Sequence, residues 1–180
     1  MLEIIKKISK YKKVFLLDCG ANYGFYSLFV ASLSEANRII GYEASPITAN
    51  SFRENVLLNS YKNVVSKNLA ISHNAEEYIN FNESLNDWES SATHELFLER
   101  VVKIKTTTID SELHNENLNG FSLVIKLDIE GNEFNAIQGG IHSISKYDPL
   151  IIIELSKYNL NNRNYDFTFF KNFLSRSEEH

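Results

Sequence analysis

A short polar turn lies between two apolar segments near the start of the chain. Residues 18–24 read DCGANYG, after the apolar segment 14–17 and before a segment with helical spacing, 25–33. This order predicts a buried strand, a tight turn and a helix, and glycines in such a turn let a ligand approach the backbone closely. Glycine turns are common between strands and helices, so the turn alone is equally consistent with a structural role.

A carboxylate follows the next apolar segment. Glu43 lies nineteen positions after Gly24 and directly follows the apolar segment 39–42. An acid at the end of the second strand of a nucleotide-binding α/β domain can accept hydrogen bonds from two ribose hydroxyls. The alternative role for Glu43 is to cap the following helix, although Ser45 is better placed to do so.

The turn also indicates which nucleoside cofactor would bind. A carboxylate such as Asp18 would repel a pyrophosphate and attract a cationic amino-acid group. S-adenosylmethionine has an ammonium, a sulfonium and a ribose diol but no phosphate, so we expect Asp18 to hold its amino-acid end directly or indirectly. The predicted cofactor-binding residues, the last three of them beside the adenine, are Asp18, Gly20, Ala21, Asn22, Gly24, Glu43, Ala44, Asn68, Leu69 and Ala70.

A second cluster of charged residues follows a later apolar segment, where 126–133 reads KLDIEGNE. Lys126 and Asp128 share one strand face, and a lysine within an apolar strand is expected to pair with a carboxylate. Asp128 and Glu130 are the predicted catalytic residues, able to accept a hydroxyl proton, position a substrate or hold a divalent ion. Helix capping is the alternative role for these acids and for Glu133. The histidines show no metal-ligand spacing, so no metal site is predicted.

These clusters need strands and helices to bring them together. The predicted strands are 14–18, 38–43, 64–70, 77–81, 101–106, 122–128 and 150–154. The predicted helices are 1–8, 25–33, 46–59, about 133–144 and 167–176. Alternating strands and helices predict an α/β domain with a mainly parallel, Rossmann-like sheet and helices on both faces. Such sheets bind ligands at the carboxyl ends of their strands, where the charged clusters fall.

Two segments of this arrangement carry further expectations. The polar stretch 82–100 is long for a compact domain and is interpreted as a lid. The apolar residues of 150–154 predict a strand that is buried on both faces.

Composition limits the class of protein. The chain has 180 residues, 43% of them apolar, and a net charge of −5, which predicts one globular domain over 1–180 with a core at about 14–155. A mildly acidic chain is a poor nucleic-acid binder. Without a signal peptide or a membrane-length apolar run, we expect a cytoplasmic protein with no membrane partner. Cys19 is the only cysteine and is expected to be a small buried side chain rather than a catalytic thiol.

The motifs together resemble the FkbM-like methyltransferases. The matching segments, in the family's order, are 18–24 (DCGANYG), 42–46 (YEASP), 55–59 (NVLLN), 68–72 (NLAIS), 108–110 (TID), 126–133 (KLDIEGNE) and 149–155 (PLIIIEL). The resemblance implies an S-adenosylmethionine-dependent enzyme of the class I methyltransferase fold that methylates hydroxyls, often on sugars or natural products. Such enzymes usually end in an antiparallel strand pair. We expect 156–180 to lack that pair, which would leave 150–154 as an edge covered by the last helix or by another subunit.

The sequence therefore predicts O-methyl transfer from S-adenosylmethionine to a saccharide or small-molecule acceptor, with S-adenosylhomocysteine as the second product. A divalent metal is possible but not indicated, and a homo-oligomer is possible. Two alternatives stay open. One is a non-catalytic module that binds S-adenosylmethionine but lacks a competent acceptor site. The other is a nicotinamide dehydrogenase, to which Asp18 and the second charged cluster are foreign.

Overall fold

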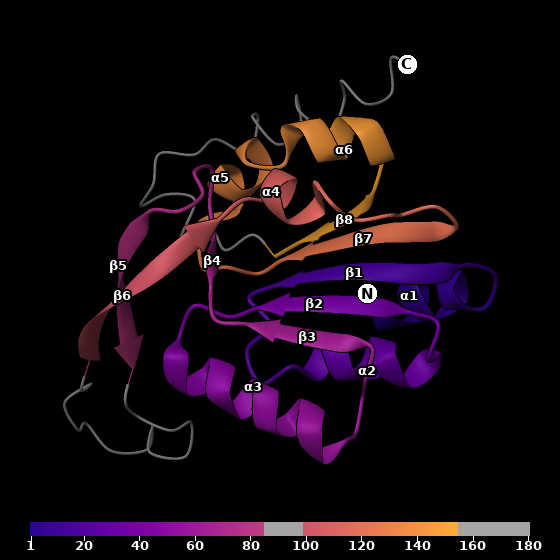
Figure 1. Ribbon diagram of the computed structural model, residues 1–180, viewed down its shortest axis with the longest axis horizontal. Helices are drawn as coiled ribbons and strands as arrows, with labels where there is room; N and C mark the ends of the chain where they lie inside the picture. Colours follow the sequence, from indigo (N-terminus) through magenta and orange to yellow (C-terminus); the bar gives the residue numbers. More distant parts are fainter. Residues whose placement is uncertain (85–98, 155–180) are drawn as a thin grey trace.

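A five-stranded parallel sheet forms the centre of the fold, with the strand order β3-β2-β1-β7-β8 (Figure 1). The computed structural model of the protein describes residues 1–84 and 99–154. The strands are β1 (Lys13–Cys19), β2 (Arg38–Tyr42), β3 (Val64–Lys67), β7 (Phe121–Leu127) and β8 (Leu150–Ile153). The chain first runs outward from β1 to β3 and then returns to the other side of β1. The switch point therefore lies between β1 and β7.

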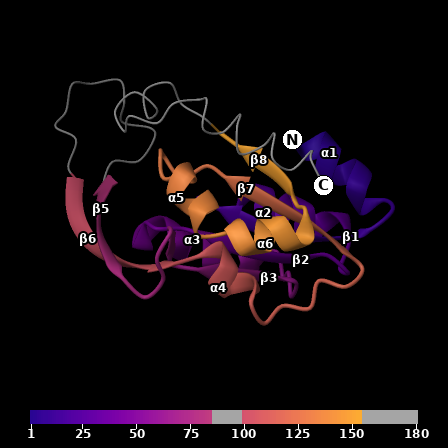
Figure 2. The same cartoon turned by 90° about the horizontal axis from the view of Figure 1, so that it is seen from above.

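Helices cover both faces of this sheet, as the sequence predicts (Figures 1 and 2). One face packs against α1 (Leu2–Ser9), α2 (Phe25–Leu33) and α3 (Pro46–Leu58). The other face packs against α4 (Ile109–Leu113), α5 (Glu133–Gln138) and α6 (Ile141–Tyr147). Alternate residues of β1 supply the two cores, with Val14 and Leu16 on the first face and Phe15 and Leu17 on the second.

A cap fixes the start of α3 close to the carboxyl end of β2. The Ser45 side chain accepts a hydrogen bond of 3.2 Å from the amide of Thr48, and Pro46 occupies the first helical turn. Thr108 caps α4 in the same way, because its side chain accepts a hydrogen bond of 3.0 Å from the amide of Ser111. The predicted helix start at Ser45 is therefore confirmed.

A second, three-stranded sheet departs from the sequence prediction. It contains β4 (Ala70–Ile71), β5 (Tyr78–Ser84) and β6 (Glu99–Thr107), with β6 in the centre. The expected single strand 64–70 is wrong, because β3 ends at Lys67 and Ala70 already pairs with Thr106 of β6. The chain leaves the first sheet at Asn68, whose side-chain amide donates to backbone carbonyls of the loop after β2.

The antiparallel hairpin of β5 and β6 is longer than predicted. Its register pairs Tyr78 with Lys105 and Ser84 with Glu99, so the predicted lid 82–100 begins and ends inside strands. The rest of that predicted lid, 85–98, lies outside the described residues. In both views the hairpin lies at the end of the molecule opposite α1, beyond the carboxyl ends of the central strands (Figures 1 and 2).

The helix predicted after β7 is two helices. Gly139 and Gly140 separate α5 from α6, and a Cβ on Gly139 would lie only 2.2 Å from the backbone oxygen of Ser72. Ile141, the first residue of α6, is 52% exposed.

The last described strand also differs from expectation. All four residues of β8 are half-buried rather than buried, and β8 is the outermost described strand on its side of the sheet. The predicted final helix and the absence of a terminal strand pair fall in 155–180, outside the described residues. Within 1–84 and 99–154, no helix is both long enough and apolar enough to cross a membrane.

Candidate functional site

The carboxyl ends of β1, β2 and β7 are neighbours in the sheet. Cys19 pairs with Tyr42 on one side and with Leu127 on the other, so the loops that follow these strands begin next to one another. Both predicted motifs are in these loops. The sheet therefore brings the turn 20–24 and the charged cluster around Asp128 to the switch point.

The turn after β1 uses its amides within the protein. Gly20 and Ala21 both donate to the carbonyl of Tyr42, each at 2.9 Å, and Asn22 donates to Oε2 of Glu43 at 2.8 Å. Asn22 adopts a left-handed φ of 51°, which asparagine tolerates better than most residues. The turn is thus bonded to the end of β2 and to the loop that follows it.

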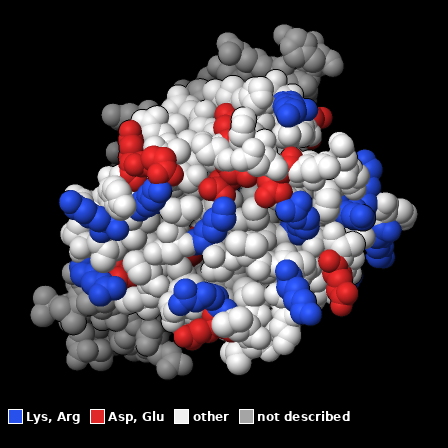
Figure 3. Space-filling view, in the orientation of Figure 1, with Lys and Arg blue, Asp and Glu red and all other residues white. Residues whose placement is uncertain are grey.

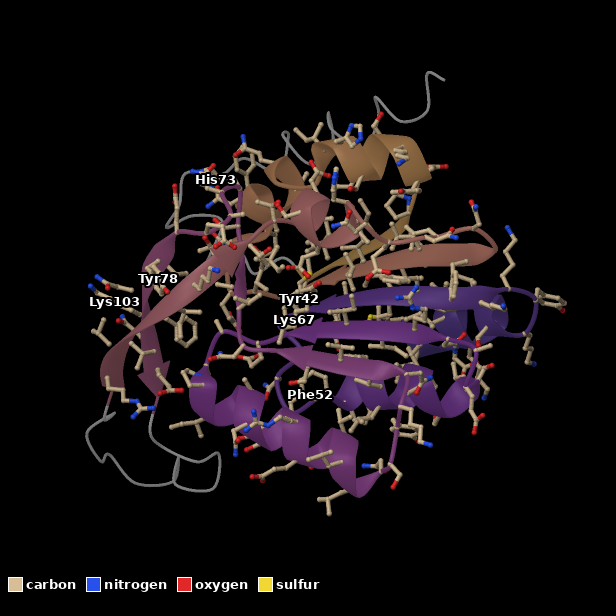
Figure 4. All side chains as sticks on the ribbon, viewed as in Figure 1. Tyr42, Phe52, Lys67, His73, Tyr78 and Lys103 are labelled. Atoms are coloured by element: carbon tan, nitrogen blue, oxygen red, sulfur yellow. The ribbon has the colours of Figure 1, made fainter. Side chains whose placement is uncertain are left out.

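The two glycines of this turn permit close packing of protein against protein. Gly20 has φ 76°, and a Cβ there would lie 1.8 Å from the backbone oxygen of Asp128. Gly24 has φ 87°, and a Cβ there would lie 2.1 Å from the ring of Phe52, a buried residue of α3 (Figure 4). The sequence predicts that a ligand approaches the backbone at these glycines, whereas the structure places protein atoms there.

Glu43 joins the loops that follow β1 and β2. Besides the bond from Asn22 to Oε2, its Oε1 accepts 2.9 Å from the amide of Ser45. Burial raises the pKa of Glu43, and the two backbone hydrogen bonds oppose that shift. Each carboxylate oxygen can accept a further hydrogen bond, as recognition of a diol requires. Ser45 supplies the side-chain cap of α3, so Glu43 is left for another role.

The residues predicted beside an adenine divide into two groups. Asn68 donates to the carbonyls of Glu43 and Ala44 at 2.8 and 2.9 Å, so these three belong to the same bonded loop. Leu69 packs against the hydrophobic core and Ala70 is buried in β4. Leu69 and Ala70 therefore belong to the core and to the second sheet rather than to the bonded loop.

Lys126 links the two motifs. Its Nζ donates 3.0 Å to the carbonyl of Gly20 and lies 3.3 Å from both Oδ1 of Asp18 and Oδ2 of Asp128. The lysine is 4% exposed, and the predicted pairing with a carboxylate is confirmed. Burial lowers the pKa of Lys126, but the two carboxylates outweigh it and raise the pKa above its ordinary value.

Asp18 is completely buried beneath the turn. Its Oδ2 accepts 2.8 Å from the hydroxyl of Ser27 in α2, whereas its Oδ1 has no hydrogen bond of good geometry and relies on the ammonium of Lys126. Burial raises the pKa of Asp18, opposed by Lys126 and Ser27. Of the two roles considered for Asp18, the indirect one, through Lys126, agrees with this burial.

The acids after β7 have different positions. Glu133 is buried, and its Oε1 accepts 3.1 Å from each of the amides of Ile129 and Gly131, so it holds the turn as a cap. Glu130 is exposed and has φ 52° at the tip of that turn. Among the described residues, no three His, Cys, Asp or Glu side chains are arranged to hold a metal ion.

Two polar clusters beside the site are not indicated by the sequence. The carboxylate of Glu112 accepts hydrogen bonds from Tyr42, Lys67 and Thr107, and Figure 4 shows Tyr42 and Lys67 together. Burial opposes the ionised form of Glu112, but these hydrogen bonds outweigh it and lower its pKa. Because these residues come from separate elements, no local spacing would have indicated the cluster.

The second cluster attaches the hairpin to α3. Oε1 of Glu83 accepts 2.5 Å from the hydroxyl of Ser45 and 3.1 Å from the amide of Ile47. Its Oε2 accepts 2.6 Å from Nε of Arg100 on the other hairpin strand. Burial raises the pKa of Glu83, but these hydrogen bonds outweigh it and bring the pKa below its usual value. Glu83 therefore ties the hairpin to the loop that contains Glu43.

The strand order and the position of these residues define the class as the Rossmann-like fold of the class I methyltransferases. The chain belongs to the FkbM methyltransferase family, because it matches the family described as Methyltransferase FkbM domain over residues 18–180. No curated protein matches the chain in sequence.

Similar solved structures share this fold. A methyltransferase FkbM from Methylobacillus flagellatus is 18% identical with a TM-score of 0.58, over 88% of this chain and 36% of that one. A candidate rRNA methylase from Clostridium thermocellum is 10% identical with a TM-score of 0.54, over 94% of this chain and 77% of that one. A candidate methyltransferase from Streptococcus mutans in complex with S-adenosylhomocysteine is 10% identical with a TM-score of 0.51, over 94% and 80%. This chain thus spans about a third of the Methylobacillus protein.

Proposed function

We propose that this protein binds S-adenosylmethionine at the carboxyl ends of β1 and β2 and transfers its methyl group to a hydroxyl of a sugar or natural-product acceptor. The observation that carries the proposal is the carboxylate of Glu43. The amides of Asn22 and Ser45 each donate a hydrogen bond to it. In this position the carboxylate can also accept hydrogen bonds from the two hydroxyls of a ribose. Membership of the FkbM methyltransferase family supports the same cofactor and reaction class.

The hydrogen bonding of the turn favours a cofactor without phosphates. Dinucleotide and phosphate sites present free backbone amides to the anion. Here the amides of Gly20 and Ala21 donate to Tyr42 at the end of β2, the amide of Asn22 donates to Glu43, and the amide of Gly24 donates a hydrogen bond of 2.8 Å to the carbonyl of Ala21. These amides offer no nest for a pyrophosphate, which argues against the nicotinamide alternative.

Each proposed residue then has a defined task. Glu43 binds the ribose, Asn68 and Ala44 shape the loop around the adenine, and Leu69 and Ala70 support that loop. Asp18 acts through Lys126 to hold the turn 20–24. When bound, S-adenosylmethionine supplies a methyl group that is already activated on a positively charged sulfur.

The acceptor half of the site is assigned to the acids that follow β7. Asp128 and Glu130 are the proposed groups that orient the acceptor hydroxyl and take its proton. The protein otherwise contributes alignment of the two reactants and exclusion of water, which lower the barrier without further covalent chemistry.

Calorimetric titration with S-adenosylhomocysteine tests the cofactor assignment. We expect the wild type to bind and Glu43→Ala to lose roughly tenfold or more in affinity, as expected for lost hydrogen bonds to a charged group. Glu35→Ala is the matched control, since Glu35 is exposed at the amino end of β2 and should leave the affinity unchanged. Absence of binding by the wild type, or equal affinities for the two variants, contradicts the proposal.

Methyl transfer is tested separately with hydroxylated saccharides and aglycones and isotopically labelled S-adenosylmethionine. Transfer of label to an acceptor oxygen supports an O-methyltransferase. Binding of the cofactor without transfer to any hydroxyl favours the alternative of a non-catalytic module.

A further inference from the structure

The cluster around Lys126 has one more carboxylate than ammonium. Asp18, Lys126 and Asp128 carry two negative charges and one positive charge when all are ionised. Nζ of Lys126 donates a hydrogen bond of 3.0 Å to the carbonyl of Gly20 and lies 3.3 Å from one carboxylate oxygen of each of Asp18 and Asp128. One ammonium thus faces two carboxylates, and one negative charge is left over.

Burial decides where that surplus charge lies. Asp18 has no exposed surface, and an uncompensated carboxylate there would be costly, so Lys126 serves mainly as its counter-ion. The side chain of Asp128 is 32% exposed, in contact with Lys126 on one side and with solvent on the other. The surplus charge is therefore on Asp128, at the edge of the site.

The backbone holds this charge in a fixed place beside the turn. The amide of Asp128 donates 3.1 Å to the carbonyl of Cys19, and its own carbonyl packs against the Cα of Gly20. The ammonium also lies over the ring of Tyr26, with Nζ 5.2 Å from the ring centroid. Asp128 therefore keeps its position relative to the segment proposed to wrap the cofactor.

We infer that Asp128, positioned by Lys126, is a subsite for the positively charged sulfur of the methyl donor, so that the protein binds S-adenosylmethionine more tightly than S-adenosylhomocysteine. The inference rests on the proposed function, because it concerns the same cofactor. The two ligands share adenine, ribose and amino acid and differ by a methyl group and a positive charge. A carboxylate near the sulfur would favour the charged donor and weaken retention of the neutral product.

The test measures the dissociation constants of both ligands by calorimetry for the wild type, Asp128→Asn and Glu43→Gln. We expect the wild type to bind S-adenosylmethionine more tightly. Asp128→Asn should reduce the ratio of the two constants at least about fivefold, which corresponds to about 1 kcal/mol of charge interaction. Glu43→Gln should weaken both ligands and leave the ratio unchanged, because both carry the same ribose.

The outcomes separate the two proposals. If the wild type binds neither ligand, the result contradicts both the proposed function and this inference. Equal weakening of both ligands by Asp128→Asn, or an unchanged ratio, overturns the inference alone. If Asp128→Asn does not fold, the wild type still decides, because the inference requires a preference for the charged donor. A wild type that binds the two ligands equally, or that binds S-adenosylhomocysteine more tightly, overturns the inference.

Discussion

Asp18 and Lys126 form an ion pair that is almost wholly removed from water, with side chains 0% and 5% exposed. Such pairs are weak evidence for net stabilisation, because desolvation of both charges offsets their attraction. Removing one partner is different, since the other charge is then left buried alone. The pair is therefore expected to behave as a unit in mutagenesis.

Lys126→Met tests this unit. We expect a loss of about 3–5 kcal/mol in the free energy of unfolding, because the carboxylate of Asp18 loses its counter-ion. Urea denaturation followed by circular dichroism measures the change. The double variant Asp18→Asn with Lys126→Met should be clearly more stable than Lys126→Met alone. Additive losses in the double variant would contradict the assignment of Lys126 as the counter-ion.

Glu43 predicts a pH dependence of cofactor binding. Burial raises its pKa above the ordinary value of about 4.3. Only the ionised carboxylate can accept from both ribose hydroxyls while it also accepts from Asn22 and Ser45. The affinity for S-adenosylhomocysteine should therefore be constant above this raised pKa and fall as the pH drops through it.

Calorimetry at a series of mildly acidic pH values measures that profile. Glu43→Gln should bind weakly with no such dependence, because the amide does not titrate. A wild-type affinity that stays flat into the range of an ordinary glutamate would contradict the assignment.

For individual residues, the sequence predicted which charged side chains pair better than it predicted which side chains are buried. The position of Lys126 in an apolar strand was enough to predict a carboxylate partner. The burial of Asp18 was not predictable, because it depends on α2 packing over β1 so that Ser27 meets the carboxylate. The residues that contact the proposed ligand remain predictions.

Among the structural elements, the turn 20–24 is closely constrained by its neighbours. Gly20→Ala would combine a left-handed φ of 76° with a Cβ 1.8 Å from the backbone of Asp128. Gly120→Ala is a matched control, since Gly120 has φ 81° and nothing within 4 Å of its added Cβ. The two variants therefore share the conformational strain and differ in steric conflict.

We expect Gly120→Ala to cost about 1–2 kcal/mol of stability from the left-handed conformation alone. Gly20→Ala should cost about 1–3 kcal/mol more, because the overlap forces the turn away from Asp128. Urea unfolding curves of the two variants provide the comparison. Equal losses would mean that the loops after β1 and β7 separate easily, which would contradict the close packing of Gly20 against Asp128.

Elements whose apolar residues recur with a clear period were predicted well. The points at which the chain leaves a sheet or a helix ends were not. Strands β1 and β7 and helix α2 agree with the predicted ranges to within one residue at each end. The exit of the chain after β3 depends on hydrogen bonds from Asn68 to a distant loop, and the division of α5 from α6 depends on contact of Gly139 with Ser72. Both are tertiary effects, which the spacing of residues along the sequence does not predict.

The whole molecule combines a predictable centre with an appended sheet. Alternation of strands and helices was sufficient for the parallel sheet and its two helical layers. The placement of the hairpin was not, because its anchor is the contact of Glu83 with Ser45 at a sequence separation of 38. On the face shown in Figure 3, acidic and basic side chains are interspersed, as in a chain of net charge −5.

Cys19 gives the molecule one further property. It is the only thiol of the chain, it has no exposed surface, and burial together with nearby carboxylates raises its pKa. Disulfide reagents and maleimides need an accessible thiolate. The thiol of the native protein should therefore not react with them until β1 separates from its neighbours. A cysteine introduced at exposed Lys103 of the hairpin would then be the sole site for a fluorophore or spin label, without removal of a native thiol.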